Sequence, residues 1–248
     1  AMGGSAAPSM GTDGTGARLM QTLGHEITPL YPALVQLRCG HPALKGLKGI
    51  RTQAELTLMI DDQAILRETG ELLLTDYGVS GVCVFQLSRE AAPALAQGRS
   101  VRLAVNFLPE IPSLLPWLDA RIRQLAPASL LALTTGVLPR LLAQTVIREA
   151  RLSPDMPAEA LSESEKQALC GALSAFPLVV TGTQGFANAQ VTRGGVSLAD
   201  VDPSTMASRL FDGLHIIGEL LDVDGPCGGY NLHFAFAGAL AAAKAIAG

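Results

Sequence analysis

The chain has 248 residues, of which 48% are hydrophobic, 4% aromatic and 16% charged, with a formal net charge of -4. This composition excludes a disordered chain, and the length allows one large domain or two interleaved ones. The mild acidity argues against a general nucleic-acid binder, which needs excess Lys and Arg. The longest apolar run, residues 234–246, is shorter than the roughly 20 residues of a membrane span and contains Lys244. We therefore expect a soluble protein with neither a nucleic acid nor a membrane as partner.

The cysteines and histidines indicate neither a disulfide framework nor a metal site. Cys39, Cys83, Cys170 and Cys227 are far apart and form no Cys-x-x-Cys pair, and the sequence shows no secretory signal at its start. We therefore expect reduced thiols in a cytoplasmic protein. Cys39 and His41 are close in sequence, but two candidate ligands fall short of a metal centre. We expect no metal.

The first part of the chain predicts a loop followed by a short helix. Residues 3–16 are rich in Gly, Ser, Thr and Pro, which is typical of a loop. Residues 17–23 then predict a helix that ends at Gly24.

Strand patterns follow. Alternating apolar residues over 51–75 predict an antiparallel hairpin, with its turn near Thr69-Gly70. A helix is expected over residues 82–91. Residues 100–108 alternate again and predict a third strand.

Residues 112–176 predict three helices that form a small bundle. The second follows Pro139, and the third begins at Ser162, where Glu165 completes a capping box. The residues expected to face inward are Leu114, Leu115, Leu118, Ile122 and Leu125 in the first helix, Leu138, Leu141, Leu142, Thr145 and Val146 in the second, and Ala168, Leu169, Leu173 and Phe176 in the third.

The C-terminal part predicts short strands over residues 178–181, 189–192 and 213–218. A loop over 219–231 leads into an almost wholly apolar helix. We expect that helix to be buried.

The loop before this helix has the composition of a ligand site. Backbone N–H groups at a helix N-terminus favour phosphate, and Gly228 and Gly229 let a ligand approach the backbone. The carboxylates of Glu219, Asp222 and Asp224 repel phosphate but accept hydrogen bonds from sugar-type hydroxyls. A ligand with hydroxyls and a phosphate fits both properties. An ordinary glycine-rich turn with solvated acids is the alternative on spacing alone.

Five stretches carry a family resemblance, and they run nearly end to end. The longest includes Gly218-Glu219, Leu221 to Gly225 and Gly228-Gly229-Tyr230-Asn231-Leu232. The others are residues 3–35, residues 70–88, Ala189 to Thr192 with Gly194-Gly195-Val196, and Thr205-Met206 with Ser208. Together they resemble the aminoacetone oxidase-like (YhiN-type) FAD-dependent oxidoreductases. Residues 112–176 match that family only in pattern.

The resemblance implies an α+β fold. Residues 1–35 and 199–248 would form part of an FAD domain of the two-dinucleotide-binding type. This domain would be interrupted by a β-barrel-like substrate-side domain, residues 36–108 and 177–198. That domain would carry a three-helix bundle, residues 109–176.

One departure from the family limits the functional inference. Members begin with a strand and a Gly-x-Gly-x-x-Gly loop that holds the FAD pyrophosphate, and this chain has neither; Gly11 to Gly16 has the wrong glycine spacing. The chain therefore resembles the C-terminal portion of such an enzyme. We expect it to be inactive by itself, to hold FAD weakly, and to act on an unknown small molecule, with NAD(P)H as an open partner, only in the complete protein. A non-catalytic scaffold that self-associates through an exposed FAD-domain edge is the alternative.

The resemblance also implies site residues, although no catalytic residue is named. Glu219 would bind the ribityl chain, residues 228–232 would line the flavin ring and the pyrophosphate, and residues 191–195 would lie near the isoalloxazine. Cys227 is interpreted as a small filler rather than a reactive thiol, and Tyr77, Tyr230 and His233 are secondary pocket candidates. The residues expected to bind FAD are Gly218, Glu219, Asp222, Gly228, Gly229, Tyr230, Asn231, Leu232, Val191, Thr192, Gly194 and Gly195.

Overall fold

The computed structural model describes residues 2–248; Ala1, the first residue of the expected FAD domain, lies outside them. The chain divides into two compact units. The terminal unit contains the described residues up to Gln36, Ser88–Pro93 and Thr183–Gly248. The barrel unit contains Leu37–Leu87 and Ala94–Gly182.

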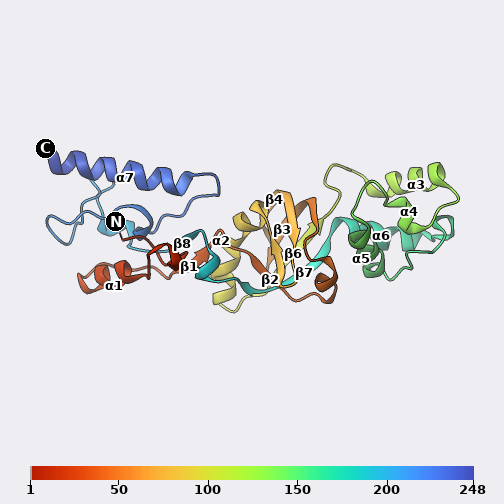
Figure 1. Cartoon of the computed structure of the whole chain (residues 1–248), viewed down its shortest axis with the longest axis horizontal. Helices are drawn as coiled ribbons and strands as arrows, with labels where there is room; N and C mark the ends of the chain where they lie inside the picture. The colour runs from red at the N-terminus through yellow and green to blue at the C-terminus, as the bar shows by residue number, and fades with distance from the viewer. Residues whose placement is uncertain (1) are drawn as a thin grey trace. The chain divides into compact units, whose positions relative to one another are not determined.

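A closed six-stranded barrel forms the core of the barrel unit (Figure 1). Inward side chains alternate along its long strands, and Leu56, Leu58 and Val105 are 0% exposed. The sheet closes on itself, so the sequence prediction of a barrel-like sheet is confirmed. The strands run in the order β2-β5-β4-β3-β6-β7: β2 (Leu37–Cys39), β5 (Gly78–Ser80), β4 (Gln63–Leu74), β3 (Arg51–Ile60), β6 (Val101–Asn106) and β7 (Phe176–Thr183).

The hairpin predicted over residues 51–75 is β3 and β4, but its predicted turn at Thr69-Gly70 is wrong. Ile60 pairs with Gln63, so the turn is Asp61-Asp62, with φ of 48° and 66°. Positive φ at both central residues matches the twist of the flanking strands. Gly70 instead pairs with Ala54 inside β4.

Helices occur at each position where the sequence predicted them in the barrel unit, and a short extra one, α4, is present. The capping box at Ser162 and Glu165 is confirmed. α6 packs against α3 and α5. The helices are α2 (Val82–Ala96), of which Ser88–Pro93 belong to the terminal unit, α3 (Leu114–Leu125), α4 (Leu130–Leu133), α5 (Arg140–Glu149) and α6 (Glu163–Ser174), with 3-10 helices at Pro42–Leu47 and Ala158–Ala160.

Three residues predicted to face inward are exposed instead. Leu125 and Leu141 are 41% and 54% exposed, and Ala168 is also exposed. In α5 the buried face includes Ala143 and Ile147 instead. In α5 the prediction identified the apolar stripe but placed its edge about one residue too early.

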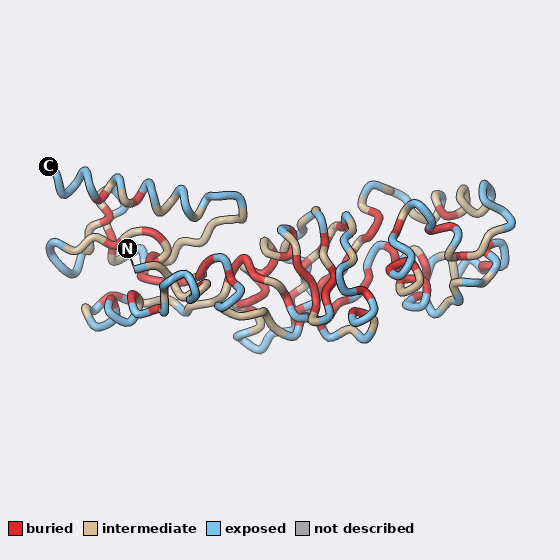
Figure 2. The backbone as a smooth tube through the Cα atoms, in the orientation of Figure 1, coloured by how far each residue is buried: buried red, intermediate tan, exposed pale blue. Residues whose placement is uncertain are grey.

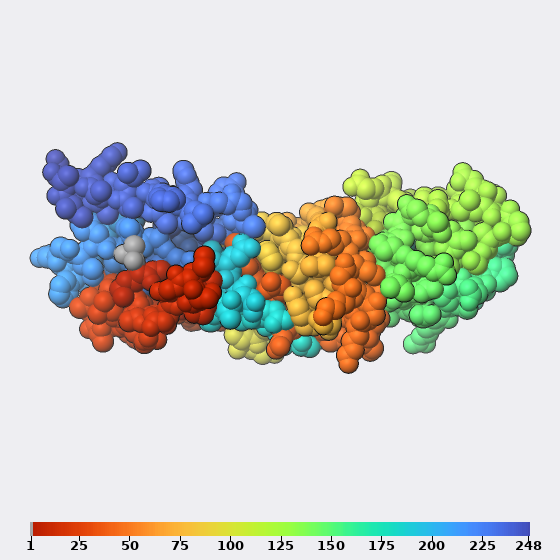
Figure 3. Space-filling view, viewed as in Figure 1, coloured from red at the N-terminus to blue at the C-terminus, as the bar shows by residue number. Residues whose placement is uncertain are grey.

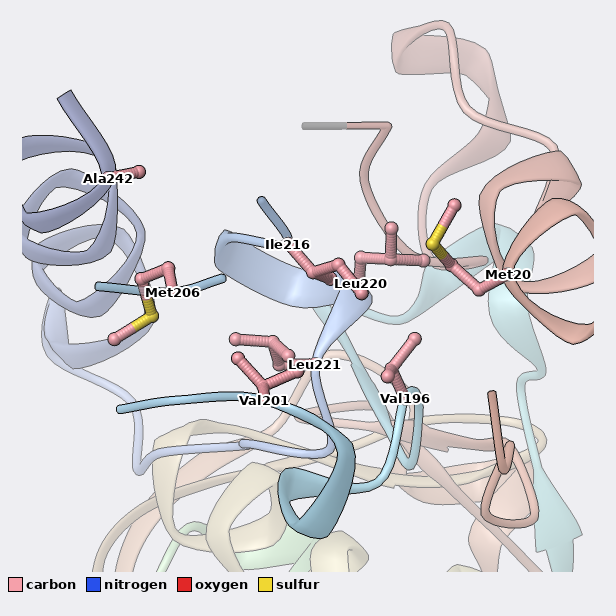
Figure 4. Close-up of a cluster of buried hydrophobic side chains, with 8 residues drawn as sticks. All are labelled: Met20, Val196, Val201, Met206, Ile216, Leu220, Leu221 and Ala242. Atoms are coloured by element: carbon pink, nitrogen blue, oxygen red, sulfur yellow. The ribbon is translucent and has the colours of Figure 1, made fainter. Parts of the chain in front are cut away.

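The terminal unit has little regular structure. β1 and β8 form a two-stranded antiparallel sheet in which Pro32 pairs with Thr192, and the helix predicted at 17–23 begins slightly earlier, at Thr15. Its elements are η1 (Pro8–Met10), α1 (Thr15–Thr22), β1 (Tyr31–Ala33), η4 (Phe186–Asn188), β8 (Val191–Arg193), η5 (Leu198–Asp200), η6 (Gly218–Leu220) and α7 (Tyr230–Ala247). Figure 4 shows its apolar core, which is made of Met20, Val196, Val201, Met206, Ile216, Leu220, Leu221 and Ala242.

The strand predicted over residues 213–218 is wrong. Gly213 and Gly218 adopt positive φ, and the segment makes only an isolated bridge, Ala207 with His215, before a 3-10 turn begins at Gly218. Left-handed glycines at both ends interrupt the extended backbone that a strand ladder needs.

The expectation that the C-terminal helix is buried is also wrong. α7 is largely exposed (Figure 2), and Phe236 and Leu240 are 70% and 64% exposed. Only Gly238 and Ala242 are buried, because the helix contacts the terminal unit along one narrow side. Within residues 2–248, no helix is long and apolar enough to cross a bilayer.

Candidate ligand-binding site

A pocket of about 290 Å3 opens in the terminal unit. Its walls are mostly apolar, and its polar groups are the side chains of Gln190, Glu219 and Asn231 and the backbone of the glycine loop. This size lies just below the roughly 300–1,000 Å3 of ligand pockets. Its lining is Leu34, Gln190, Val191, Glu219, Val223, Pro226, Cys227, Gly228, Gly229, Asn231, Leu232 and Ala235.

The structure brings many of the sequence-predicted site residues together. Val191, Glu219, Gly228, Gly229, Asn231 and Leu232 line the pocket. Thr192, Gly194 and Gly195 line a neighbouring cavity of about 10 Å3, which also contacts Glu219. Gly218, Asp222 and Tyr230 line neither cavity.

Glu219 lies where three segments of the terminal unit meet. Its Oε1 accepts a hydrogen bond from the backbone N–H of Thr192 at 2.8 Å. The buried Thr192 Oγ1 accepts from the backbone N–H groups of Ser5 and Ala6 at 2.7 and 2.9 Å. A Cβ at Gly4 would lie 2.3 Å from Glu219 Oε1, so this position requires glycine. On the face in Figure 3, the N-terminal residues (red) accordingly lie beside the β8 region (cyan).

Burial raises the pKa of Glu219 above its ordinary value, although the hydrogen bond from Thr192 opposes this shift. The half-buried side chain has a second oxygen, Oε2. A carboxylate of this kind is suited to hydroxyl donors and unsuited to phosphate.

Gly194 and Gly195 allow three backbone segments to pack closely. A Cβ at Gly194 would lie 2.1 Å from the carbonyl oxygen of Pro29, and one at Gly195 would lie 2.6 Å from that of Leu220. Val196 N–H donates to the Leu220 carbonyl at 2.8 Å in the same region. These glycines therefore have a structural role that stands beside any contact with a ligand.

The glycine loop leads directly into α7 at the pocket. Gly228 and Gly229 have φ of 123° and 92°, and no side chain caps the N-terminus of the helix. The first-turn N–H groups of a helix have no partner inside the helix and carry its positive dipole end. The pocket therefore combines an anion-attracting wall with a carboxylate that prefers hydroxyls.

Two arginines hold the loop before α7, a role that the sequence analysis did not predict for either. Asp224, which was interpreted as a hydroxyl-binding acid, pairs with Arg89, Nε to Oδ2, at 2.6 Å, and its side chain is 11% exposed. Arg193 donates to the Arg89 carbonyl at 2.7 Å. Arg89 lies in the predicted helix and Arg193 in the 191–195 stretch, and neither local pattern indicated Asp224 as a partner.

The secondary candidates lie in different surroundings. Cys227 lines the pocket, with its Sγ 3.9 Å from Gln190 Oε1. Tyr230 and His233 are exposed, and Tyr77 lies in the barrel unit between β4 and β5. Burial raises the pKa of the Cys39 thiol to about 12, so that thiol is not a reactive group. Residues 2–248 contain no group of three or more His, Cys, Asp or Glu that could hold a metal.

Comparison with known proteins gives one family. The HI0933-like protein Rossmann domain matches residues 1–245. The chain is 38% identical to a 3-dehydro-bile acid delta(4,6)-reductase of Clostridium scindens over 100% of this chain and 61% of the relative. It is 31% identical to the ribosomal RNA dihydrouridine synthase of Escherichia coli and 28% identical to that of Haemophilus influenzae, each over 59% of the relative and 98% and 99% of this chain. The chain thus spans about three fifths of the length of these relatives.

Proposed function

The chain belongs to the HI0933-like protein Rossmann domain family, and from this premise we propose that its pocket holds part of an FAD in a flavin-dependent oxidoreductase. This family is one of FAD-dependent oxidoreductases, which agrees with the aminoacetone oxidase-like resemblance of the sequence. The observation that carries the proposal is the convergence of Glu219, the Gly228-Gly229 loop and the uncapped α7 N-terminus on one pocket.

The residues present fit one part of the cofactor. A polyol chain offers hydroxyl donors to Glu219, and a pyrophosphate suits free N–H groups at a helix start. A Cβ at Gly229 would meet no atom within 4 Å, so the backbone there is open to a ligand. A volume of about 290 Å3 has room for one part of a dinucleotide but not for all of it, which favours weak binding by this chain alone.

Each site residue has a proposed role. Glu219 receives the ribityl hydroxyls, and Gly228 to Leu232 lie along the flavin ring and the pyrophosphate. Val191 to Gly195 lie near the isoalloxazine, while Gly218, Asp222 and Tyr230 support the loop outside the pocket lining. A bound flavin would supply the hydride chemistry, with NAD(P)H as the proposed electron donor, and the protein groups orient it and exclude water.

The domain assignment is part of the same proposal. Residues 1–35 and 199–248 contribute to an FAD domain of the two-dinucleotide-binding type. Residues 36–108 and 177–198 form the substrate-side barrel domain, and residues 109–176 form a three-helix bundle inserted in it. The complete enzyme carries out the reaction in this proposal, and this chain supplies only part of its cofactor site.

We further propose a small unsaturated molecule as the substrate. The printed names of the relatives describe addition of hydrogen to a bile acid in one case and to a uridine of ribosomal RNA in the other. Charge favours the first class: the barrel unit has as many acidic as basic residues, so the net charge of -4 lies in the terminal unit. Several barrel-unit cations are also paired with acids, including Lys48 with Asp76 and Arg51 with Glu71. RNA binding requires a basic excess that this charge distribution lacks.

A flavin titration of the whole chain tests the proposal. We expect saturable but weak quenching of FAD fluorescence, with a Kd between about 10 μM and 1 mM. Gly229→Val should abolish binding because its side chain would fill the open space beside the glycine loop, whereas Gly46→Ala, in open space in the barrel unit, should not change it. Absence of saturable binding by the wild-type chain contradicts the proposal. An RNA oligonucleotide that binds at 0.15 M salt contradicts the substrate class.

The second candidate is a self-associating scaffold. The observation that favours it is the exposed apolar surface of α7, which includes Tyr230, Leu232, Phe236, Leu240 and Ile246. Exposed apolar patches of this kind mark interaction surfaces. Light scattering that shows a dimer, with no flavin bound at any concentration, would favour the scaffold over the flavin site.

A further inference from the structure

The loop that forms one wall of the pocket is held at two adjacent residues. At Asp224, Arg89 donates from Nε to the carboxylate at 2.6 Å and from Nη2 to the backbone carbonyl at 2.8 Å. At Gly225, the side-chain amide of Asn231 accepts from the N–H at 2.7 Å and donates to the carbonyl at 3.0 Å. The pocket-lining residues Pro226 to Gly229 lie between Gly225 and Asn231.

A second arginine fixes the first. Arg193 Nη1 donates to the Arg89 carbonyl at 2.7 Å and to Glu90 Oε1 at 2.8 Å, and Arg193 Nε lies 4.0 Å from Asp224 Oδ1. Arg193 ends β8, directly after Thr192, whose N–H holds Glu219. β8 therefore anchors both the carboxylate of the pocket and the network that holds the loop of residues 224–229.

The burial of Asp224 favours Arg89 as the residue that holds the loop in place. Asp224 is largely removed from water, and a buried carboxylate that loses its partner is strongly destabilised. A carboxylate left in this state would move toward solvent and take the loop with it. Arg89 contacts both the side chain and the backbone of Asp224, whereas Arg193 reaches the carboxylate only at 4.0 Å.

We propose that Arg89 is a positioning residue for the ligand pocket: through Asp224 it holds the loop of residues 224–229 in its ligand-ready conformation, and Arg193 orients Arg89. The position of the loop does not depend on a ligand, whereas the effect of Arg89 on FAD affinity rests on the proposed flavin function.

The thiol of Cys227 reports the loop position without any ligand. Iodoacetamide labelling of the full chain, measured for each cysteine by mass spectrometry, should accelerate about tenfold at Cys227 in Arg89→Ala, because the loop opens more often. Alkylation requires access of the reagent to the thiol, so acceleration at Cys227 reports movement of the loop. Cys170, half-buried in the barrel unit, should keep its wild-type rate.

Matched variants separate positioning from general unfolding. Arg99→Ala removes an exposed pair of similar length in the barrel unit, 2.7 Å to Asp61, and should leave Cys227 unchanged. Arg89→Lys keeps the charge and should give an intermediate rate. Asp224→Asn added to Arg89→Ala should recover part of the protection, because it removes the unpaired carboxylate. If Arg89→Ala also increases labelling of the buried Cys39 and Cys83, the chain has unfolded more generally. The labelling rate of Cys227 in Arg89→Lys then tests the positioning proposal.

FAD titration of the same variants tests the effect on affinity. Arg89→Ala should weaken FAD binding about tenfold and Arg89→Lys less. A Cys227 labelling rate equal to that of the wild type in both Arg89 variants would overturn the positioning proposal. Failure of the wild-type chain to bind FAD would contradict the flavin function, and the labelling result would still decide the role of Arg89. Faster Cys227 labelling with unchanged FAD affinity would overturn the proposed link between the loop position and FAD binding.

Discussion

The two units are stabilised in different ways. The barrel unit closes a six-stranded sheet around fully buried residues such as Leu56 and Val105, so its stability is spread over many similar contacts. The terminal unit has one two-stranded sheet and several isolated bridges, and it depends on particular glycines and on side chains such as Thr192 that bond to the backbone. The candidate site lies in the unit whose structure depends on single residues, where a ligand can contribute to holding the loops.

The largest effect on stability is expected from the barrel core. Leu56→Ala leaves a cavity where a side chain is 0% exposed and should lower the free energy of unfolding by about 2–5 kcal/mol. Ile65→Ala, at a 45% exposed position on β4, is the matched control and should cost less than about 1 kcal/mol. Urea unfolding followed by circular dichroism measures both. Equal losses would mean that the barrel interior is not the stabilising core.

An intermediate effect is expected from a single glycine of the terminal unit. Gly195→Ala places a Cβ 2.6 Å from the Leu220 carbonyl oxygen and should cost about 1–3 kcal/mol. Hydrogen exchange should accelerate first at the amides of Val196 and Asp222, which bond across this contact. Gly46→Ala, with no heavy atom within 4 Å, is the control. Uniform exchange across both units would contradict a local effect.

A smaller effect with opposite signs in the two units is expected from pH. The pKa of Glu219 is raised above 4.5 by burial, so its stabilising contribution is present below pH 4.5 and is lost as pH rises through the folded value. Glu219→Gln should therefore gain stability relative to wild type as pH rises from 4.5 to 7. Hydrogen bonds from Arg99 and Ser100 lower the pKa of Asp61 below 3.8, so its contribution is present above pH 3.8 and is lost on acidification.

Asp61→Asn should accordingly lose stability at pH 7, and its difference from wild type should shrink below pH 3.8. Urea midpoints of the two variants and wild type between pH 3 and 7 measure both slopes. Parallel curves for the two variants would contradict the assigned environments of the two carboxylates.

The smallest effect on stability is expected on α7. Phe236→Ser removes a side chain that is 70% exposed and should change the free energy of unfolding by less than about 0.5 kcal/mol. Ala242→Asp, which buries a charge on the other side of the same helix, should destabilise the terminal unit clearly. Thermal unfolding compares the two. A large loss from Phe236→Ser would show that this face of α7 is covered.

Local patterns determined much of the barrel unit and part of the site. Alternation along β3, β4 and β6 predicted the strands, because one face of each is buried, and the Ser162–Glu165 capping box marked the start of α6. Six of the residues predicted for the site line one pocket. Gly228, Gly229, Asn231 and Leu232 form the glycine loop and the helix start, whereas Val191 and Glu219 come from other segments.

Tertiary structure decided the rest. The hairpin turns at Asp61-Asp62 and not at Gly70, because pairing of Gly70 with Ala54 extends β4 past that glycine. Composition indicated that α7 is apolar, but a helix is buried only where another element covers it, and its Phe236 side is open. The Arg89–Asp224 contact joins residues 135 positions apart, so no local pattern could reveal it. Sequence by itself determined the elements whose pattern repeats, whereas contacts between single distant residues, which set the loop at the candidate site, emerged only when the chain was folded.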